Sequence, residues 1–130
     1  MYNEEKTHLS YFENQFSVRM VRPTIMLPLW KILGKSLGQI TSFGGINLAM
    51  NLTESVETVI NQHYKEQLEY LESINEEKDL VMHIKKFNEE ELEHKDIAIK
   101  NGSTELIAYR PINFFVKLGC KIAISLSKKI

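Results

Sequence analysis

The sequence predicts an all-α protein of one domain, and two observations lead to this fold class. Apolar residues recur at helical spacing along most of the chain, and no stretch of any length alternates like a half-buried strand. The chain has 130 residues, which suits one domain with a hydrophobic core. Its single cysteine excludes an internal disulfide and fits a reducing compartment. We therefore expect residues 1–130 to form a single helical domain.

Residues that terminate helices divide the chain into five expected stretches. The first ends at about Val18, ahead of Arg22-Pro23, because a residue before proline avoids the α region. Gly44-Gly45 separates the second from the third. A capping box from Ser73 to Glu76 is expected to start the fourth, which ends at Asn101-Gly102. Pro111 is expected to begin the fifth. The second and third stretches cover about 29–42 and 46–72.

The second and fifth stretches are apolar, but neither predicts a transmembrane helix. Pro28, Lys31 and Lys35 interrupt the second, whereas a span needs roughly 20 apolar residues. In the fifth, Phe114 and Phe115 begin an apolar stripe that is surrounded by lysines. This composition is typical of a helix that lies in a membrane interface, although an ordinary packed helix can look the same.

The overall charge and the N-terminus give no indication of a nucleic-acid-binding or a secreted protein. The formal net charge is −1, so the composition gives no reason to expect nucleic-acid binding. The lysines near the C-terminus are a local cluster only. No secretory signal is recognised, because the N-terminus is acidic and polar.

One four-residue pattern occurs twice, as Glu5 with His8 and as Glu91 with His94. In the fourth stretch the pair continues an apolar stripe, which places a carboxylate and an imidazole on the core-facing side. The first pair shares a stripe with two phenylalanines, and Glu57 shares one with apolar residues of the third stretch. An unpaired buried carboxylate costs several kcal/mol, so these groups need partners.

The spacing also brings these groups together. Glu57 and Glu91 lie at similar distances before and after the Ser73 turn, so an antiparallel hairpin sets them within one helical turn of each other. In a four-helix bundle, one Glu from each of two helices and a Glu-x-x-His pair from each of the other two hold two metal ions. Carboxylates neutralise the ions, and imidazole suits iron. The sequence therefore predicts a carboxylate-bridged di-iron site.

The alternative is a set of solvated or ion-paired faces. That interpretation is favoured for six other glutamates, namely Glu4, Glu66, Glu69, Glu89, Glu90 and Glu93. His63 and Tyr64 could line a pocket, but a packed tyrosine beside an exposed histidine is an equal alternative. We expect His83 at the surface, Trp30 in the core or facing a membrane, and Cys120 as a small buried residue.

Five segments also match a known family: EEKTHL, VRPTIMLPLWKILGKSLG, VETVINQHY, KKFNEEELEHKDIAI and KLGCKIAISLS. On these segments, which run through nearly the whole chain, the sequence resembles the demethoxyubiquinone hydroxylases of ubiquinone biosynthesis. That family comprises membrane-associated di-iron monooxygenases with a ferritin-like fold. The resemblance implies a ferritin-like di-iron bundle with two additional apolar, membrane-associating helices. The combination of VRPT…PLW…LG with ELEH-x-D is more specific than the di-iron pattern alone.

The resemblance implies roles for individual residues. Glu5 and Glu91 would bridge two Fe ions, His8 and His94 would be terminal ligands on separate irons, and Glu57 would be a terminal carboxylate. In addition, His63 and Tyr64 match a His-Tyr pair close to the family's substrate pocket. The implied reaction is hydroxylation of a polyprenylated methoxy-benzoquinol by O2, with electrons from an external donor or from the reduced quinol.

One departure from the family concerns the N-terminus. Family members carry an upstream helix whose Asn-His-Ala-Gly-Glu motif supplies a sixth ligand, and this sequence begins downstream of it. We therefore expect the first bundle helix to be missing from this sequence, and Met1 to be an internal methionine of a longer gene. Either the recorded gene start is then wrong, or the chain is the product of a degraded gene.

Three functions remain open at this point. The first is the active hydroxylase, at the cytoplasmic face of a bacterial plasma membrane or the matrix face of the mitochondrial inner membrane. As partners we expect O2, the polyprenyl benzoquinol, a membrane surface, and a second copy of the chain or a lipid-binding protein. The second is an inactive remnant, or a helical module that binds quinone or lipid without catalysis. A ferritin-type iron-storage protein is the third, and the two greasy helices argue against it.

Overall fold

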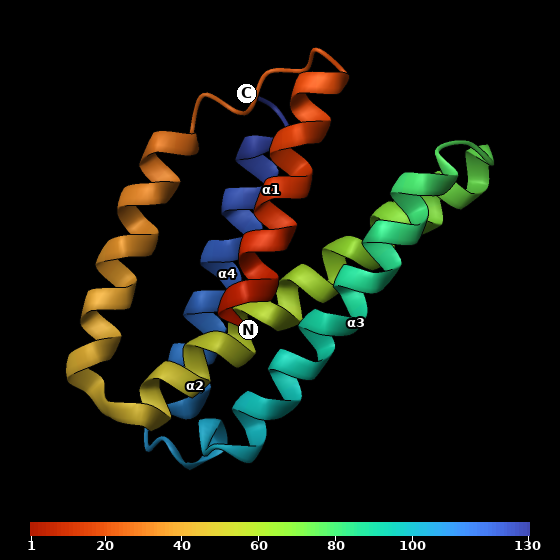
Figure 1. Ribbon diagram of the computed structural model, residues 1–130. Coiled ribbons are helices and arrows are strands. Elements are labelled where there is room, and N and C mark those ends of the chain that lie inside the picture. Colours follow the sequence, from red (N-terminus) through yellow and green to blue (C-terminus); the bar gives the residue numbers. More distant parts are fainter.

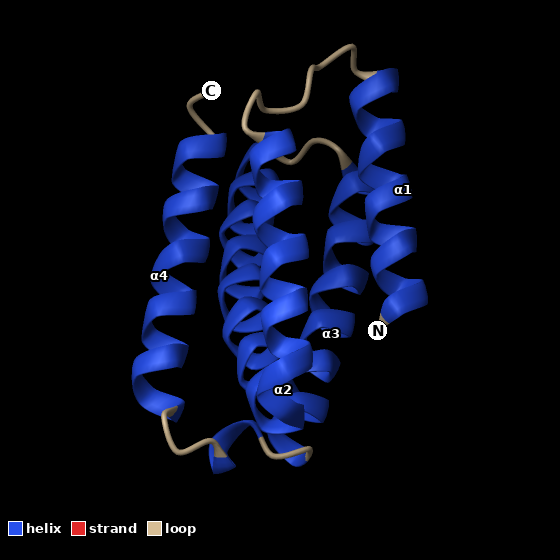
Figure 2. Ribbon diagram, turned by 90° about the vertical axis from the view of Figure 1, so that its left-hand side faces the viewer, coloured by secondary structure: helices blue, strands red, loops and turns tan.

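The computed structural model describes residues 1–130 and contains helices without strands, which confirms the all-α prediction (Figure 1). The long helices are α1 (Tyr2–Val18), α2 (Leu27–Ile74), α3 (Lys78–Lys100) and α4 (Tyr109–Ser127). A short 3-10 turn, η1 (Ser103–Glu105), lies between α3 and α4. Figure 2 shows the long helices running roughly along one common axis. The chain thus forms a helical bundle of the ferritin-like type.

A kink divides α2 into two arms, which we call the first arm (27–44) and the second arm (46–74). Gly45 at the kink has φ 78° and ψ 176°, a conformation that is costly for any residue with a Cβ. Figure 1 shows the first arm turned away from the second. The predicted break at Gly44-Gly45 is therefore confirmed, as a sharp bend without an intervening loop.

The first arm is attached to the C-terminal end of α4. The Trp30 indole Nε1–H donates to Ser127 Oγ over 2.8 Å, and the Ile25 amide donates to the Ile130 carbonyl over 3.2 Å. Most apolar side chains of the first arm are exposed, and so are several on α4. No helix in residues 1–130 is long and apolar enough to cross a membrane.

The turn between α2 and α3 differs from the prediction. Ser73 lies inside the last turn of α2, where its hydroxyl donates to the Tyr70 carbonyl over 2.6 Å. Asn75 then ends the helix with φ 51°, and α3 begins after Glu77, which has φ 59°. The expected capping box at Ser73 is therefore wrong, because a left-handed asparagine terminates α2 two residues later.

The other predicted boundaries hold to within two residues. Helix α3 ends just before Asn101-Gly102, and Gly102 takes the left-handed conformation at φ 95°. Helix α4 begins at Tyr109, so Pro111 lies in its first turn, where a proline is tolerated.

The apolar core lies where α1, the second arm and α3 meet. Its buried members are Tyr64, Leu71, Ile84 and Phe87. Residues of α1 pack against this cluster, and the Phe12 and Phe87 rings meet edge to face with centroids 5.8 Å apart. This core is small, so the polar residues buried beside it contribute much to how the helices are placed.

Candidate metal centre

The five sequence-predicted ligands lie together where α1, the second arm of α2 and α3 meet. Helix α1 supplies Glu5 and His8, the second arm of α2 supplies Glu57, and α3 supplies Glu91 and His94. One ligand atom from each of four of these residues falls within 4.8 Å of the others: Glu5, Glu57, Glu91 and His94. His8 borders the same group through Glu91. We call these five residues the metal cluster.

Glu91 lies between the two histidines. Its Oε1 is 3.0 Å from His8 Nδ1, and its Oε2 is 3.2 Å from His94 Nδ1. His94 Nδ1 also lies 3.3 Å from Glu5 Oε1 and 4.0 Å from Glu57 Oε1. Each oxygen of one carboxylate therefore faces a different histidine, which is the arrangement that a bridging ligand needs.

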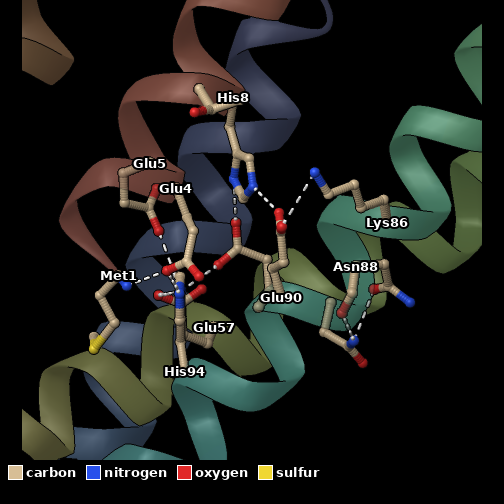
Figure 3. A network of polar contacts seen from close by, with 12 residues as sticks. Met1, Glu4, Glu5, His8, Glu57, Lys86, Asn88, Glu90 and His94 are labelled. Atoms are coloured by element: carbon tan, nitrogen blue, oxygen red, sulfur yellow. Dashed lines mark hydrogen bonds and ion pairs between the residues drawn. The ribbon is translucent and has the colours of Figure 1, made fainter.

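A hydrogen bond between helices fixes the register of this site. The Asn61 amide donates to Asn88 Oδ1 over 2.7 Å (Figure 3 labels Asn88). Asn61 lies one helical turn after Glu57, and Asn88 lies three residues before Glu91. Since both amides are on faces adjacent to the cluster, this bond sets the two carboxylates level, as the hairpin argument predicts.

Burial differs among the ligands. The exposed fractions of His8, Glu57, Glu91 and His94 are between 2% and 7%. By contrast, half of the Glu5 side chain is exposed, although its Oε1 reaches His94. The prediction that Glu5 faces the core is therefore only partly right, because this residue lies in the first turn of α1, at the edge of the bundle.

Crowded carboxylates dominate the electrostatics of the site. Burial, a hydrogen bond with Glu91 and the charge of that neighbour raise the pKa of Glu57 to about 9. Burial and the Glu91 charge also raise the pKa of Glu5. Both shifts show that negative charge is disfavoured here in the absence of a cation.

The donor set and its unpaired atoms fit a metal ion. His8 Nδ1 lies close to Glu91 but lacks the alignment of a hydrogen bond, and Glu57 Oε2 also has no hydrogen-bond partner. Buried polar atoms are rarely left unpaired in proteins. Three carboxylates and two imidazole nitrogens converge here, and cations would both pair these atoms and relieve the repulsion.

Two glutamates outside the predicted set contact the histidines at Nε2, the ring nitrogen that does not face Glu91. Glu90 Oε2 lies 2.7 Å from His8 Nε2, and Glu4 Oε2 lies 2.9 Å from His94 Nε2 (Figure 3). The expectation of solvated or ion-paired faces therefore holds in part: both glutamates are partly exposed and ion-paired, but the partners of each include a histidine of the metal cluster. The sequence carried a sign of them, because each copy of the pattern reads Glu-Glu-x-x-His, as EEKTH and EELEH.

The structure separates His63 from Tyr64. Tyr64 is buried in the apolar core, stacked on Phe12 with ring centroids 6.4 Å apart, and burial raises the pKa of its hydroxyl. His63 is partly exposed and lines a groove of about 810 Å³ that also contains Lys95, Lys117, Lys121 and Lys128. Burial, together with the Lys128 charge, lowers the pKa of His63. Of the pair, the histidine lines this groove and the tyrosine packs in the core.

An apolar groove of about 460 Å³ lies beyond the metal cluster towards the α2–α3 turn. Phe12 and Ile84 form part of its wall, with Arg19 at its polar rim. Phe12 lies one helical turn after His8, on the same face of α1. The groove is therefore within about one helical turn of the cluster and is lined mainly by apolar side chains, among them Phe16, Val21, Tyr70, Leu71 and Leu80.

Comparison with known proteins gives consistent results. The family described as "Ubiquinone biosynthesis protein COQ7" matches residues 1–127. A Dictyostelium discoideum protein called "NADPH-dependent 3-demethoxyubiquinone 3-hydroxylase, mitochondrial" is 39% identical over 131 residues, covering 100% of this chain and 60% of its own length. The human protein of the same name is 39% identical over 132 residues, with 100% and 61% covered.

A bacterial relative shows the same pattern. The Rhodospirillum rubrum "3-demethoxyubiquinol 3-hydroxylase" is 36% identical over 130 residues, covering 100% of this chain and 60% of the relative. The chain thus spans about 60% of the length of the curated relatives that it matches.

Proposed function

This chain belongs to the family of the ubiquinone biosynthesis protein COQ7, and on that premise we propose that it hydroxylates a polyprenylated methoxy-benzoquinol with O2 at a di-iron centre. The observation that carries the proposal is the position of Glu91, whose two oxygens face Nδ1 of His8 and Nδ1 of His94 at 3.0 and 3.2 Å. Two metal ions, each beside one histidine, would share this carboxylate.

The five cluster residues would hold the irons in distinct ways. Glu91 and Glu5 would bridge, His8 and His94 would each bind one iron, and Glu57 would be a terminal ligand. When bound, two reduced irons would supply electrons to O2 for hydroxylation. The protein's part is to orient the ligands and to exclude water, and the burial of His8, Glu57, Glu91 and His94 suits both tasks.

The apolar groove is the candidate site for the quinol. Its walls of Phe12, Leu80 and Ile84 would contact an aromatic head group or the first isoprenoid units. Because the groove lies within about one turn of His8, a ring held there would be close to the metal cluster.

Delivery of such a substrate favours a membrane surface. Exposed apolar residues on the first arm of α2 and on α4 include Phe43, Phe114 and Phe115. Lysines surround those on α4, which suits an anionic bilayer. Mitochondrial and bacterial relatives favour the matrix face of the inner membrane or the cytoplasmic face of a bacterial membrane.

The electron donor is part of the same proposal. The names of two relatives specify NADPH. In this chain, the lysine groove beside His63 has the charge that would attract a phosphate-bearing donor. An electron-donating quinol in the apolar groove is the alternative.

One observation favours a second candidate. Half of the Glu5 side chain is exposed, and an open ligand shell would weaken the hold on one iron. A helical module that binds quinone or lipid without catalysis would keep the groove and the membrane surface but not the two irons.

Iron content after anaerobic Fe(II) loading of the 130-residue protein tests the proposal. About two irons per chain, followed by O2-dependent hydroxylation of a short-chain methoxy-benzoquinol, is the expected result. One iron or none, with quinol binding retained, would instead support the non-catalytic module. Glu69→Gln, at an exposed position of the same α2 arm as Glu57, is the matched control for effects of charge alone.

A further inference from the structure

The contacts behind the two histidines form a reciprocal pattern across the α1–α3 interface. Glu90 precedes the ligand Glu91 on α3 and reaches His8 on α1. Likewise, Glu4 precedes the ligand Glu5 on α1 and reaches His94 on α3. Each helix therefore provides a second carboxylate for the histidine of the other helix (Figure 3).

These contacts place a proton on Nε2 of each histidine. An ionised carboxylate can only accept a hydrogen bond, so Nε2 of His8 and Nε2 of His94 must donate. With the proton of each ring held at Nε2, Nδ1 would be the nitrogen left to bind a metal ion. In both residues Nδ1 faces Glu91, and a metal ion bound there would replace the 3.2 Å hydrogen bond between His94 Nδ1 and Glu91 Oε2.

We propose that Glu90 and Glu4 are positioning residues for the metal cluster. Each accepts a hydrogen bond from Nε2–H of the histidine on the opposite helix, which would leave Nδ1 to bind a metal ion. This inference rests on the proposed metal centre and adds two residues to it. A carboxylate behind a ligating histidine also increases the basicity of the ligand nitrogen.

Glu90 and Glu4 differ in their exposure to solvent. The exposed fraction of the Glu90 side chain is 21%, against 41% for Glu4. Lys86 Nζ lies 3.6 Å from Glu90 Oε1, on the side away from His8. Because Glu90 is less exposed to water, its replacement should have the larger effect.

The first test observes the Nε2–H groups directly in the metal-free protein. Imidazole 15N spectra should show a hydrogen-bonded proton on Nε2 of both His8 and His94. Glu90→Leu should remove that hydrogen bond, shift the Nε2 signal of His8 and leave His94 unchanged. Glu89→Leu, an exposed neighbour on α3, is the control and should change neither.

The second test measures metal affinity by Co(II) titration, followed through the visible absorption of the bound ion. Glu90→Leu should weaken binding by about 10- to 100-fold, and Glu90→Gln by less, because its amide oxygen can still accept a hydrogen bond. The Gln variant also serves if the Leu variant does not fold.

The outcomes separate this inference from the proposed function. If Glu90→Leu leaves both the His8 Nε2 signal and the Co(II) affinity unchanged, the positioning role is wrong while a metal-binding wild type still supports the di-iron site. If the Nε2 signal changes as expected but the wild type binds no metal, Glu90 does orient His8 and the proposed function is what fails.

Discussion

Oε1 of Glu91 on α3 lies 3.0 Å from Nδ1 of His8 on α1. Only the packing of the two helices makes this contact, whereas Glu91 and His94 are neighbours by their spacing on one helix. Because of this contact, the two oxygens of Glu91 face one histidine from each copy of the repeated pattern. The chemistry of the centre therefore depends on how closely α1 approaches α3.

Replacement of Glu57 by glutamine should stabilise the metal-free protein and impair metal loading. Burial and the neighbouring Glu91 disfavour charge at this position, so a neutral amide of similar shape should raise the free energy of unfolding by about 1–3 kcal/mol. Urea unfolding without metal measures the first effect, and iron per chain measures the second. A stability gain with undiminished iron content would contradict the assignment of Glu57 as a ligand.

The ion pair between Arg19 and Glu77 should contribute stability that is lost in acid. Arg19 Nη1 donates to Glu77 Oε1 over 2.9 Å, and this pairing lowers the pKa of Glu77 from 4.5. The contribution is therefore fully present above pH 4.5 and disappears as the pH falls through the lowered value. The difference in Tm between wild type and Glu77→Gln should shrink accordingly.

Salt provides a control for the same ion pair. Both side chains are more than one-third exposed, so the effect should be small and should weaken at about 1 M salt, where the Debye length is about 3 Å. A Tm difference that is independent of both pH and salt would show that Glu77 acts through helix packing.

Phe87 should be the most costly aromatic residue to truncate. Only 2% of it is exposed, and its ring lies 4.1 Å from the His8 ring, centroid to centroid. Phe87→Ala should lower the free energy of unfolding by about 3–5 kcal/mol and also reduce metal loading, because His8 loses its packing partner. Phe43→Ala is the matched comparison, since that side chain is 91% exposed, and it should change stability by less than about 0.5 kcal/mol.

Lipid binding should depend on the apolar face of α4. Phe114 and Phe115 are 61% and 67% exposed, and full burial of such a side chain is worth about 1.5–3 kcal/mol. Their joint replacement by serine should weaken binding to vesicles containing anionic lipid by at least about tenfold, measured by cosedimentation. Tyr70→Ser should leave vesicle binding unchanged. Tyr70 is also exposed, at 65%, but it lies near the C-terminal end of α2 and not on α4. Equal vesicle binding by the wild type, the double serine variant and Tyr70→Ser would contradict a membrane role for α4.

Several features followed directly from the sequence. Helical periodicity predicted the helices, and Gly44-Gly45 predicted the kink in α2. The spacing within each copy of the pattern put a glutamate and a histidine on one face of a helix. These are local properties, because the backbone repeats every 3.6 residues whatever surrounds it.

Other features could not be predicted in this way. A left-handed Asn75 displaced the start of α3 beyond Ser73, and turn conformations of this kind compete closely in energy. Similarly, Glu4 and Glu90 resembled any exposed acidic residues until the other helix placed a histidine beside each.

The sequence by itself determined the helices, their apolar faces and the set of residues able to bind metal. The tertiary structure decided that Glu91 lies between His8 and His94, that Glu4 and Glu90 contact those histidines from behind, and that Glu5 stays half exposed. Periodicity fixes directions around one helix axis. Distances between side chains on different helices depend on the separation, rotation and register of those helices, and these are set only when the core packs.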